Sequence, residues 1–291
     1  MNDLIQAFEG TASFLPVYVA WLAIFFAAER LFPATGHKSM RGWSFNLATT
    51  VLYLAGSALA SGLGALIGTA LGQRLGGGLI DLRIPRADTV PGAVAATLLF
   101  LFVYDFFYYW WHRAQHKHPS LWAIHKLHHL DEAVNASTDL RHHWLEDLGR
   151  LPTIVIPMTI LFRLSPQADG VVGFLFASWT LFIHANLRLS LGRWSWVVDG
   201  PQLHRIHHSR LREHFDRNFA AFFPIWDVLF VTYFHPRRGE FPPTGVADEP
   251  AVSRVLDGAL LPFRTWFGAP RGIEPVGPQP IASGLQDDRP G

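Results

Sequence analysis

Histidines are concentrated in one part of the chain, in three short boxes with regular spacing. Thirteen of the fifteen histidines lie between His112 and His214. Eight of them form the boxes HRAQH (112–116), HKLHH (125–129) and HRIHH (204–208). Neutral imidazole is the commonest metal ligand in proteins, and residues three or four apart share one face of a helix. Each box therefore aims two or three imidazoles at one point. Three boxes supply more nitrogen ligands than one ion needs, which predicts a two-metal site.

The composition limits the kinds of protein and of metal site. Of 291 residues, 49% are hydrophobic and 16% are charged, and the mean hydropathy is +0.18. These values suit a membrane protein with substantial polar parts. The formal net charge of +1 gives no electrostatic footprint for nucleic acid. The chain has no cysteine, which excludes disulfides, thiolate metal sites and cysteine-bound iron–sulfur clusters. Any metal must be held by nitrogen and oxygen atoms.

Three apolar segments, at residues 14–32, 47–71 and 92–111, are long enough to cross a bilayer. The third ends in Tyr108-Tyr109-Trp110-Trp111, which is typical of an aromatic belt at a membrane surface. We therefore predict an all-α fold: an integral-membrane, multi-pass bundle of about four membrane helices or helical hairpins, with a histidine-rich helical cap. A soluble bundle with very apolar core helices is the alternative fold.

The second and third boxes flank two shorter apolar stretches between residues 151 and 187, split around Ser165-Pro166-Gln167. If all boxes form one site, this region must run into the membrane and come back as a hairpin. The basic residues near the boxes favour a cytoplasmic site. We expect N-terminal membrane helices at 1–94, a catalytic domain at 95–235 and a Pro/Gly-rich tail at 236–291, irregular from about Gly268.

The setting of the boxes narrows the choice of metal. Imidazole suits iron, zinc, copper and nickel. A hydrolytic zinc ion needs three protein ligands and one open position, which is far fewer than the boxes provide. The boxes also lie at the ends of apolar segments, where a lipid can enter sideways. A pair of iron ions that activates dioxygen for attack on a lipid C–H bond fits these features best.

Longer stretches of sequence around the boxes carry a family resemblance. They read DFFYYWWHR at 105–113, LWAIHKLHH at 121–129, NASTDLRHHWLE at 135–146, HAN at 184–186, HRIHH at 204–208, Asn218, and WDVLF at 226–230. In these stretches the chain resembles the fatty acid hydroxylase superfamily, which includes sterol desaturases, sterol methyl oxidases and alkylglycerol monooxygenases. The resemblance covers roughly residues 95 to 235 and is specific in combination. It implies a membrane-bound, non-haem di-iron oxygenase.

The resemblance also implies a ligand set. The expected metal ligands are His112, His116, His125, His128, His129, His204, His207 and His208, with His184 as a ninth and His143 as either a ligand or a residue behind one. His142 and His214 match no family histidine. Metal-bound histidines usually donate their second N–H to an acid, an amide or a carbonyl. The candidates for that role are Asp105, Asn135, Asp139, Glu146, Asn186, Asn218 and Asp227.

The chain departs from the sequence pattern of the family at positions that bear on its substrate and its partners. Phe219-Ala220 stands where relatives often have Tyr-Gly. Arg188 stands four residues after His184, where certain fatty acid 2-hydroxylases have a histidine; this favours the sterol-desaturase-like or ether-lipid branches. No cytochrome b5-like module is evident before His112. The expected partners are therefore a lipid substrate (sterol, fatty acyl or alkyl chain), dioxygen, a separate electron-donor protein and the membrane.

Two other classes remain open at this stage. One is a membrane metal-binding or transport protein without oxygenase activity, although transporters place their ionisable ligands near the bilayer midplane. The other is a bis-histidine haem carrier, whose histidines would be paired across spanning helices. Metal analysis with an absorption spectrum discriminates between these classes.

Overall fold

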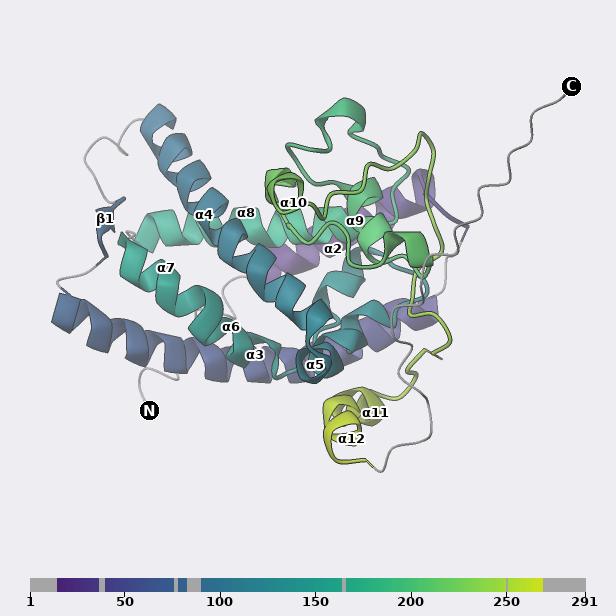
Figure 1. Cartoon of the computed structure of the whole chain (residues 1–291), viewed down its shortest axis with the longest axis horizontal. Coiled ribbons are helices and arrows are strands. Elements are labelled where there is room, and N and C mark those ends of the chain that lie inside the picture. Colours follow the sequence, from purple (N-terminus) through teal and green to yellow (C-terminus); the bar gives the residue numbers. More distant parts are fainter. Residues whose placement is uncertain are drawn as a thin grey trace, which may run out of the picture.

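The computed structural model describes residues 15–36, 40–75, 78–82, 90–163, 166–249 and 251–268. The chain is mostly helical (Figure 1). In the ranges described, strand is limited to β1 (Ile80–Asp81) and β2 (Phe162–Arg163), which pair in parallel over two residues each. The expectation of a helical fold is confirmed. The predicted irregular tail beyond Gly268 lies outside the described residues.

Two helices dominate the architecture: α3 (Met40–Leu75) and α4 (Val90–Lys117). Within them, Gly42–Arg74 and Pro91–Lys117 have mean hydropathies of 1.7 and 1.5, and only 22% and 17% of an apolar 18-residue window in each are buried. A large apolar surface on the outside of a protein marks a place where a membrane or another partner covers it. Among the described residues, these two helices are therefore long and apolar enough to cross a membrane.

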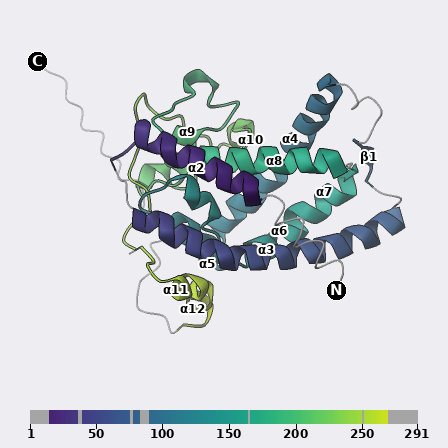
Figure 2. The same cartoon turned by 180° about the vertical axis from the view of Figure 1, so that it is seen from behind.

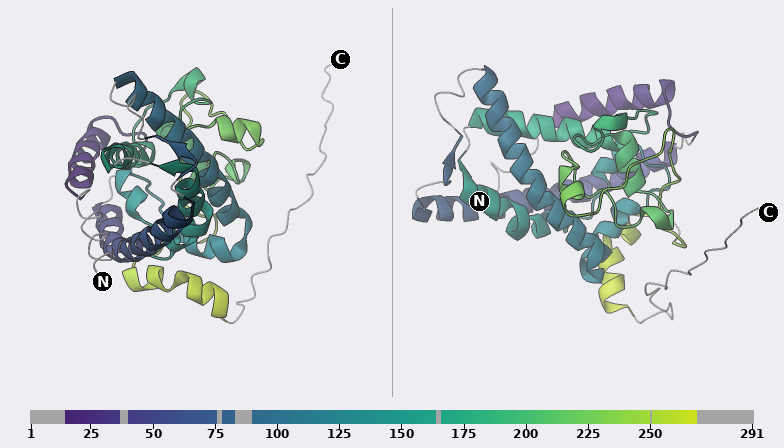
Figure 3. Two further views of the ribbon diagram at one scale, coloured as in Figure 1. Left: turned by 90° about the vertical axis from the view of Figure 1, so that its left-hand side faces the viewer. Right: turned by 45° about the horizontal axis from the view of Figure 1, so that its top comes forward.

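The first predicted segment forms α2 (Leu15–Leu31), whose 17 residues are shorter than the two dominant helices. α2 packs along α8 (Pro166–His184), as the rear view shows (Figure 2). In the end-on view, α2, α3, α4 and α8 surround the middle of the molecule (Figure 3). Glu29 of α2 is buried and accepts hydrogen bonds from the backbone N–H groups of Ala136 and Asn186. This helix end is thereby tied to the region that carries the histidines.

α4 continues without a break through the first histidine box. The aromatic run before the box does not form a belt, because its side chains point in different directions around the helix. Tyr109 is fully buried against Phe219 and Phe230, and Trp111 lies in a core cluster. Of the two tryptophans, Trp110 is exposed and Trp111 is buried. The prediction of an aromatic belt is therefore wrong for Tyr109 and Trp111, which are buried. The first histidine box is part of the long apolar helix itself.

The segment between the second and third boxes makes the expected hairpin. It leaves through α6 (Glu146–Arg150), a π-helical turn at Leu151–Val155 and α7 (Ile156–Leu161). It returns through α8, which ends at His184 (Figure 1). Pro152 and Pro157 lie in the outgoing part, and proline removes a backbone donor from a helix. Both boxes consequently lie at one end of the bundle.

Short elements cap that end of the bundle. They are α5 (Pro119–His129), a 3₁₀ turn at Ala136–Leu140, α9 (Pro201–His207) and α10 (Ile225–Leu229). The region predicted as a Pro/Gly-rich tail also contains two helices, α11 (Val255–Ala259) and α12 (Leu261–Phe267), with α12 packed against α5 and α11 against α3. This part of the chain therefore supports the helix of the second histidine box.

Candidate metal centre

Cluster 1 consists of five histidines from three helices. One nitrogen of each lies within 4.8 Å of the others. α4 contributes His112 and His116, α5 contributes His125 and His129, and α9 contributes His207. His125 Nε2 lies 3.1 Å from His112 Nε2 and from His129 Nε2, and His129 Nε2 lies 3.2 Å from His207 Nε2. Ligand atoms about 2 Å from a shared ion stand about this far apart.

Cluster 2 consists of four buried histidines: His128, His184, His204 and His208. His184 is the last residue of α8, His204 lies on α9, and His208 caps the end of α9. The Nε2 atom of His184 lies 3.1 Å from that of His128 and 2.9 Å from that of His204. Both nitrogens of His208 are buried and have no hydrogen-bond partner among the residues that the structure describes. An uncompensated buried polar atom is costly, and a metal ion at this point would remove the cost.

The two clusters touch because each HxxHH box contributes to both. Adjacent residues on a helix point in directions roughly 100° apart. His128 therefore faces cluster 2 while His129 faces cluster 1, and His208 and His207 divide in the same way. The rings of His129 and His208 stack with centroids 4.4 Å apart. Together the boxes and His184 build two adjacent nitrogen-rich sites.

Backbone carbonyls determine which nitrogen of three rings is free. The Nδ1 atoms lie 2.8 Å from Phe219 O for His112, 2.9 Å from Arg217 O for His207, and 2.7 Å from Thr180 O for His184. A carbonyl oxygen only accepts, so each Nδ1 carries the proton and donates it. In a neutral ring the Nε2 atom then carries a lone pair. These lone pairs point at the other histidine nitrogens, an arrangement that suits a cation between them.

Carboxylates lie beside other Nδ1 atoms. Glu146 Oε1 is 3.4 Å from His125, and it also accepts a hydrogen bond from Gln115 at 2.7 Å. Asp199 Oδ2 is 3.5 Å from His204 Nδ1. Such carboxylates fix the ring orientation and raise its basicity. Glu146 was among the expected supporting residues. Asp199 and Gln115 were not: Asp199 lies in no distinctive pattern, and Gln115 lies inside the first box but is not a histidine.

Two further carboxylates repeat this arrangement. Asp139, also an expected residue, lies 3.6 Å from His184 Nδ1 and accepts a hydrogen bond from Thr180. Asp216 lies 3.8 Å from His116 Nδ1 and pairs with Lys117. Asp216 has a φ of 59°, in the left-handed region. No sequence motif marked Asp216.

Asp105 and Asp227 act one step further from the clusters than expected. Asp105 accepts hydrogen bonds from the N–H groups of Ala221, Phe222 and Phe223. Asp227 accepts from the N–H groups of Phe219 and Ala220 and from the Thr232 hydroxyl. These two acids therefore fix the backbone of the loop at 219–223. That loop presents the Phe219 carbonyl to His112.

The three expected asparagines hydrogen bond to backbone groups or to an arginine rather than to histidines. Asn218 pairs with both backbone groups of Phe234 and has a φ of 57°. Asn135 caps the 3₁₀ turn at Ala136–Leu140. Asn186 Oδ1 accepts from Arg205, which lies on α9 between histidines of both clusters. Each amide holds a segment that carries, or lies next to, a histidine or its partner.

His143 lies apart from both clusters. Its Nε2 donates to the Ala259 carbonyl at 3.0 Å, and its Nδ1 accepts from the N–H of Leu145. Both nitrogens are thus engaged within the protein, which leaves neither free to bind a metal in this structure. His142, which matches no family histidine, stacks on His128 with centroids 4.4 Å apart and lies with His125 and Glu146 in a third titratable group.

Burial keeps these imidazoles neutral. Burial, followed by the nearby His184 and His207, lowers the pKa of His204 well below its ordinary value. Burial also lowers the pKa of His207, to about 3, although the hydrogen bond to Arg217 O opposes the shift. Burial alone would raise the pKa of Glu146, but the adjacent His125 and His142 reverse this and leave it well below its ordinary value. Neutral imidazole is the form that binds a metal.

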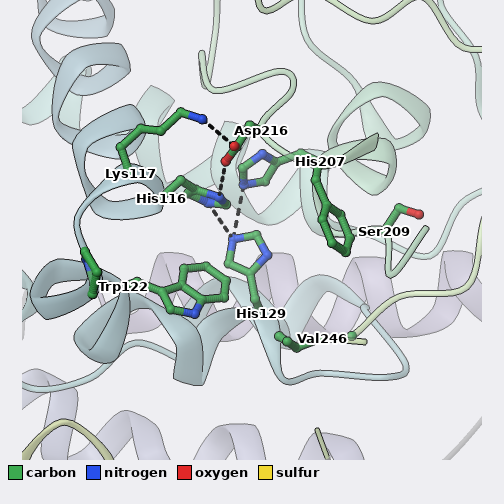
Figure 4. A pocket seen from close by; sticks show the side chains of 11 residues that line it. His116, Lys117, Trp122, His129, His207, Ser209, Asp216 and Val246 are labelled. Carbon is green, nitrogen blue, oxygen red and sulfur yellow. Dashed lines mark hydrogen bonds and ion pairs between the residues drawn. The ribbon is translucent and has the colours of Figure 1, made fainter. Parts of the chain in front are cut away.

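A cavity of about 280 Å³ reaches cluster 1 from outside the bundle (Figure 4). His116, His129 and His207 form its inner wall, and the Lys117–Asp216 ion pair lies at its side. The ring of Trp122 lies 5.0 Å from that of His116 and 5.3 Å from that of His129. This cavity gives small molecules a path to the histidines of cluster 1.

Fold and site together define a helical protein with two apolar helices and two adjacent candidate metal sites. Residues 97–232 match the model described as fatty acid hydroxylase, and this part of the chain belongs to the fatty acid hydroxylase family. Every histidine of both clusters lies inside the matched range.

Named relatives span different shares of the chain. Ornithine lipid hydroxylase OlsE of Rhizobium tropici is 28% identical over 275 residues, covering 94% of this chain and 81% of that protein. Alkylglycerol monooxygenase of Homo sapiens is 35% identical over 130 residues, which are 44% of this chain and 28% of that protein. Very-long-chain aldehyde decarbonylase GL1-7 of Oryza sativa subsp. japonica is 25% identical over 205 residues, 66% of this chain and 30% of that protein. No solved structure matches the chain at a significant level.

Proposed function

We propose that the chain is a membrane-bound di-iron oxidoreductase that uses dioxygen to hydroxylate or desaturate a C–H bond of a lipid. The observation that carries the proposal is the pair of touching histidine clusters, with nine nitrogens in two groups. Redox-active iron suits imidazole ligands. Relatives whose names specify ornithine lipid hydroxylation and alkylglycerol monooxygenation support a lipid substrate.

We propose that His112, His116, His125, His129 and His207 hold one iron and that His128, His184, His204 and His208 hold the other. When bound, the iron pair would supply the redox chemistry that reduces dioxygen and removes hydrogen from carbon. For hydroxylation, the substrate, one dioxygen molecule, two electrons and two protons give the alcohol and one water. For desaturation the same inputs give an alkene and two waters. The electrons must come from an external donor protein.

The residues of the chain have three tasks in this reaction. The carbonyls of Phe219, Arg217 and Thr180 hold three imidazoles with Nε2 free. The carboxylates of Glu146 and Asp199 orient two more. The four histidines of cluster 2 are buried, which limits access of bulk water and protects a reactive site from side reactions. Holding the ligands rigidly reduces the rearrangement needed during the reaction.

The proposed topology places α2, α3, α4 and the α7–α8 hairpin in or against the bilayer, as about four membrane helices or hairpins. The clusters then lie at one membrane surface. Exposed basic residues Lys117, Arg210 and Arg212 lie on the same cap, and such residues are enriched on the cytoplasmic side. We therefore assign the clusters to the cytoplasmic face, where a donor protein has access.

The test combines metal analysis with lipid profiling. The purified protein, loaded anaerobically with ferrous iron, is expected to hold two irons per chain and to lack a haem absorption band. Cells with the gene are expected to contain a lipid that has gained one oxygen atom or lost two hydrogen atoms relative to cells without it. His128→Ala is expected to abolish the product, and His235→Ala, outside both clusters, is the matched control. Iron binding without any oxygen-dependent product would favour a metal-binding or transport protein instead.

A further inference from the structure

A second, smaller cavity lies inside the helical bundle, next to cluster 2. Its volume is about 40 Å³. Its wall includes His128 and His184 of cluster 2 together with Tyr18, Tyr53, Tyr108 and Arg150. These four polar side chains come from α2, α3, α4 and α6, so four separate helices direct polar groups toward one place. We call this cavity the tyrosine slot.

The polar lining of the tyrosine slot is unusual for its surroundings. α3 and α4 are the two helices of the described chain that are long and apolar enough to cross a membrane. Polar groups inside a membrane bundle are costly and usually serve a function. The slot is also too small for a hydrocarbon chain, because a cavity of about 10–15 Å³ already holds one water and the slot measures only about 40 Å³. It has room for one polar group of a ligand.

Carboxylates already pair with Arg150, the one arginine in the slot wall, and a further carboxyl group, Asp139, also lines the slot. Arg150 lies 3.0 Å from Asp147 Oδ1 and 3.7 Å from Glu146 Oε1. The Tyr53 hydroxyl donates to the same Asp147 oxygen at 3.3 Å. An anionic headgroup would compete with two carboxylates for Arg150. The slot therefore favours a neutral group over a phosphate or a carboxylate.

Two phenol groups remain to bind such a ligand. In the described part of the chain, the Tyr18 and Tyr108 hydroxyls make no bond comparable to that between Tyr53 and Asp147. A phenol donates one hydrogen bond and also accepts. An uncharged oxygen, as in a hydroxyl, an ether or an amide, can accept a hydrogen bond from these phenols.

We propose that the tyrosine slot binds a neutral oxygen of the lipid substrate, so that the oxidised carbon lies within a few bonds of that oxygen. This inference rests on the proposed oxygenase function. Because His128 and His184 form part of the slot wall, a group bound in the slot lies against cluster 2. The substrate class is thus a lipid oxidised beside its polar group and not in the middle of its chain.

The test compares two probes that share one alkyl chain. Iron-loaded, full-length protein in detergent is titrated under anaerobic conditions with 1-O-hexadecylglycerol and with hexadecane. We expect Tyr108→Phe and Tyr18→Phe each to weaken binding of 1-O-hexadecylglycerol about threefold to tenfold, the loss of one hydrogen bond. Binding of hexadecane should be unchanged. Tyr104→Phe is the matched control, because Tyr104 lies one turn before Tyr108 on α4 but does not line the slot.

The outcomes separate the slot from the oxygenase proposal. Equal affinity for both probes, or no effect of either slot variant on 1-O-hexadecylglycerol, would overturn the slot. A product oxidised at mid-chain would overturn it as well, although oxygenase activity would stand. Selective binding lost in the slot variants, without oxygen-dependent product from any lipid, would instead sink the oxygenase function and leave the slot as a binding site.

Discussion

The Nδ1 atom of His112 donates to the backbone carbonyl of Phe219 across 2.8 Å, joining α4 to a loop 107 residues later. This bond fixes the protonation of the first histidine in the first box. Phe219 is fully buried, and its own N–H is held by Asp227. This series of hydrogen bonds, from Asp227 through Phe219 to His112, therefore connects an acid outside cluster 1 to a histidine within it.

Asp227→Asn should loosen this connection. An amide has one accepting oxygen, whereas Asp227 uses both oxygens to accept from Phe219, Ala220 and Thr232. We expect iron affinity to fall about tenfold to a hundredfold, as for other residues behind metal ligands. Titration of the protein with ferrous iron measures the change. Asp257→Asn, on α11, serves as the control and should retain wild-type affinity. Equal iron affinity in the two variants would show that Asp227 does not act through His112.

Deletion of single ligands should empty one cluster at a time. His207→Ala removes a nitrogen of cluster 1, and His204→Ala removes one of cluster 2. Each variant is expected to retain about one iron per chain after desalting, because the other cluster keeps its ligands. His143→Ala should retain both irons, since His143 hydrogen bonds to Ala259 O outside the clusters. Loss of iron from His143→Ala would return that residue to the ligand set.

The histidine boxes were predictable because spacing carries their geometry, whereas His184 was expected only from the family resemblance. Three or four residues make one helical turn, so HxxxH and HxxHH become convergent groups once a helix forms. The same regularity explains why adjacent histidines of one box separate between clusters. The long helices followed from apolar length alone, which is the strongest signal in this sequence.

The supporting residues were less predictable because tertiary contacts select them. Asp199 and Asp216 reach His204 and His116 from loops, and no local pattern distinguishes them from surface acids. The carbonyls of Thr180, Arg217 and Phe219 have no side-chain signature at all. His143 matched the family text, yet the local chain direction turns it toward Ala259. The tyrosines of the slot come from separate helices, whose packing the sequence does not specify.

Stability without metal should fall as the solution is acidified. His207 has a pKa of about 3 in the folded chain, against an ordinary value of 6.5. Above pH 6.5 the ring is neutral in both states and its contribution to stability is fully present. Between 6.5 and 3 the unfolded chain binds the proton and the folded chain does not, so stability falls with pH. His128, His129, His204 and His208 shift in the same direction.

The acid dependence is measurable as the thermal midpoint of iron-free protein between pH 7.5 and 5. Each such histidine contributes a slope of about 1.4 kcal/mol per pH unit below 6.5. His207→Ala is expected to reduce the slope by about one proton. A midpoint that stays constant over this range would mean that the rings are protonated in the folded chain as readily as in the unfolded one.

Gly56 should be intolerant of a side chain. A methyl group at this position of α3 would lie 2.0 Å from the backbone oxygen of Trp144, so the two segments would have to separate. Gly56→Ala is expected to reduce stability by about 1 to 3 kcal/mol. Gly72→Ala, on the same helix with nothing within 4 Å of the added atom, should be neutral or stabilising by up to about 1 kcal/mol. Thermal unfolding in detergent compares the pair, and equal midpoints would contradict the close packing.

The continuity of α4 has a mechanical consequence. A single continuous helix carries both the apolar stretch from Pro91 and the proposed ligands His112 and His116. With a rise of about 1.5 Å per residue, the length of the helix sets the distance between cluster 1 and the far end of the apolar stretch. In a thicker bilayer the helix must tilt less or draw the clusters inward. Membrane thickness would thereby set how far a lipid has to rise before its reacting carbon meets the site.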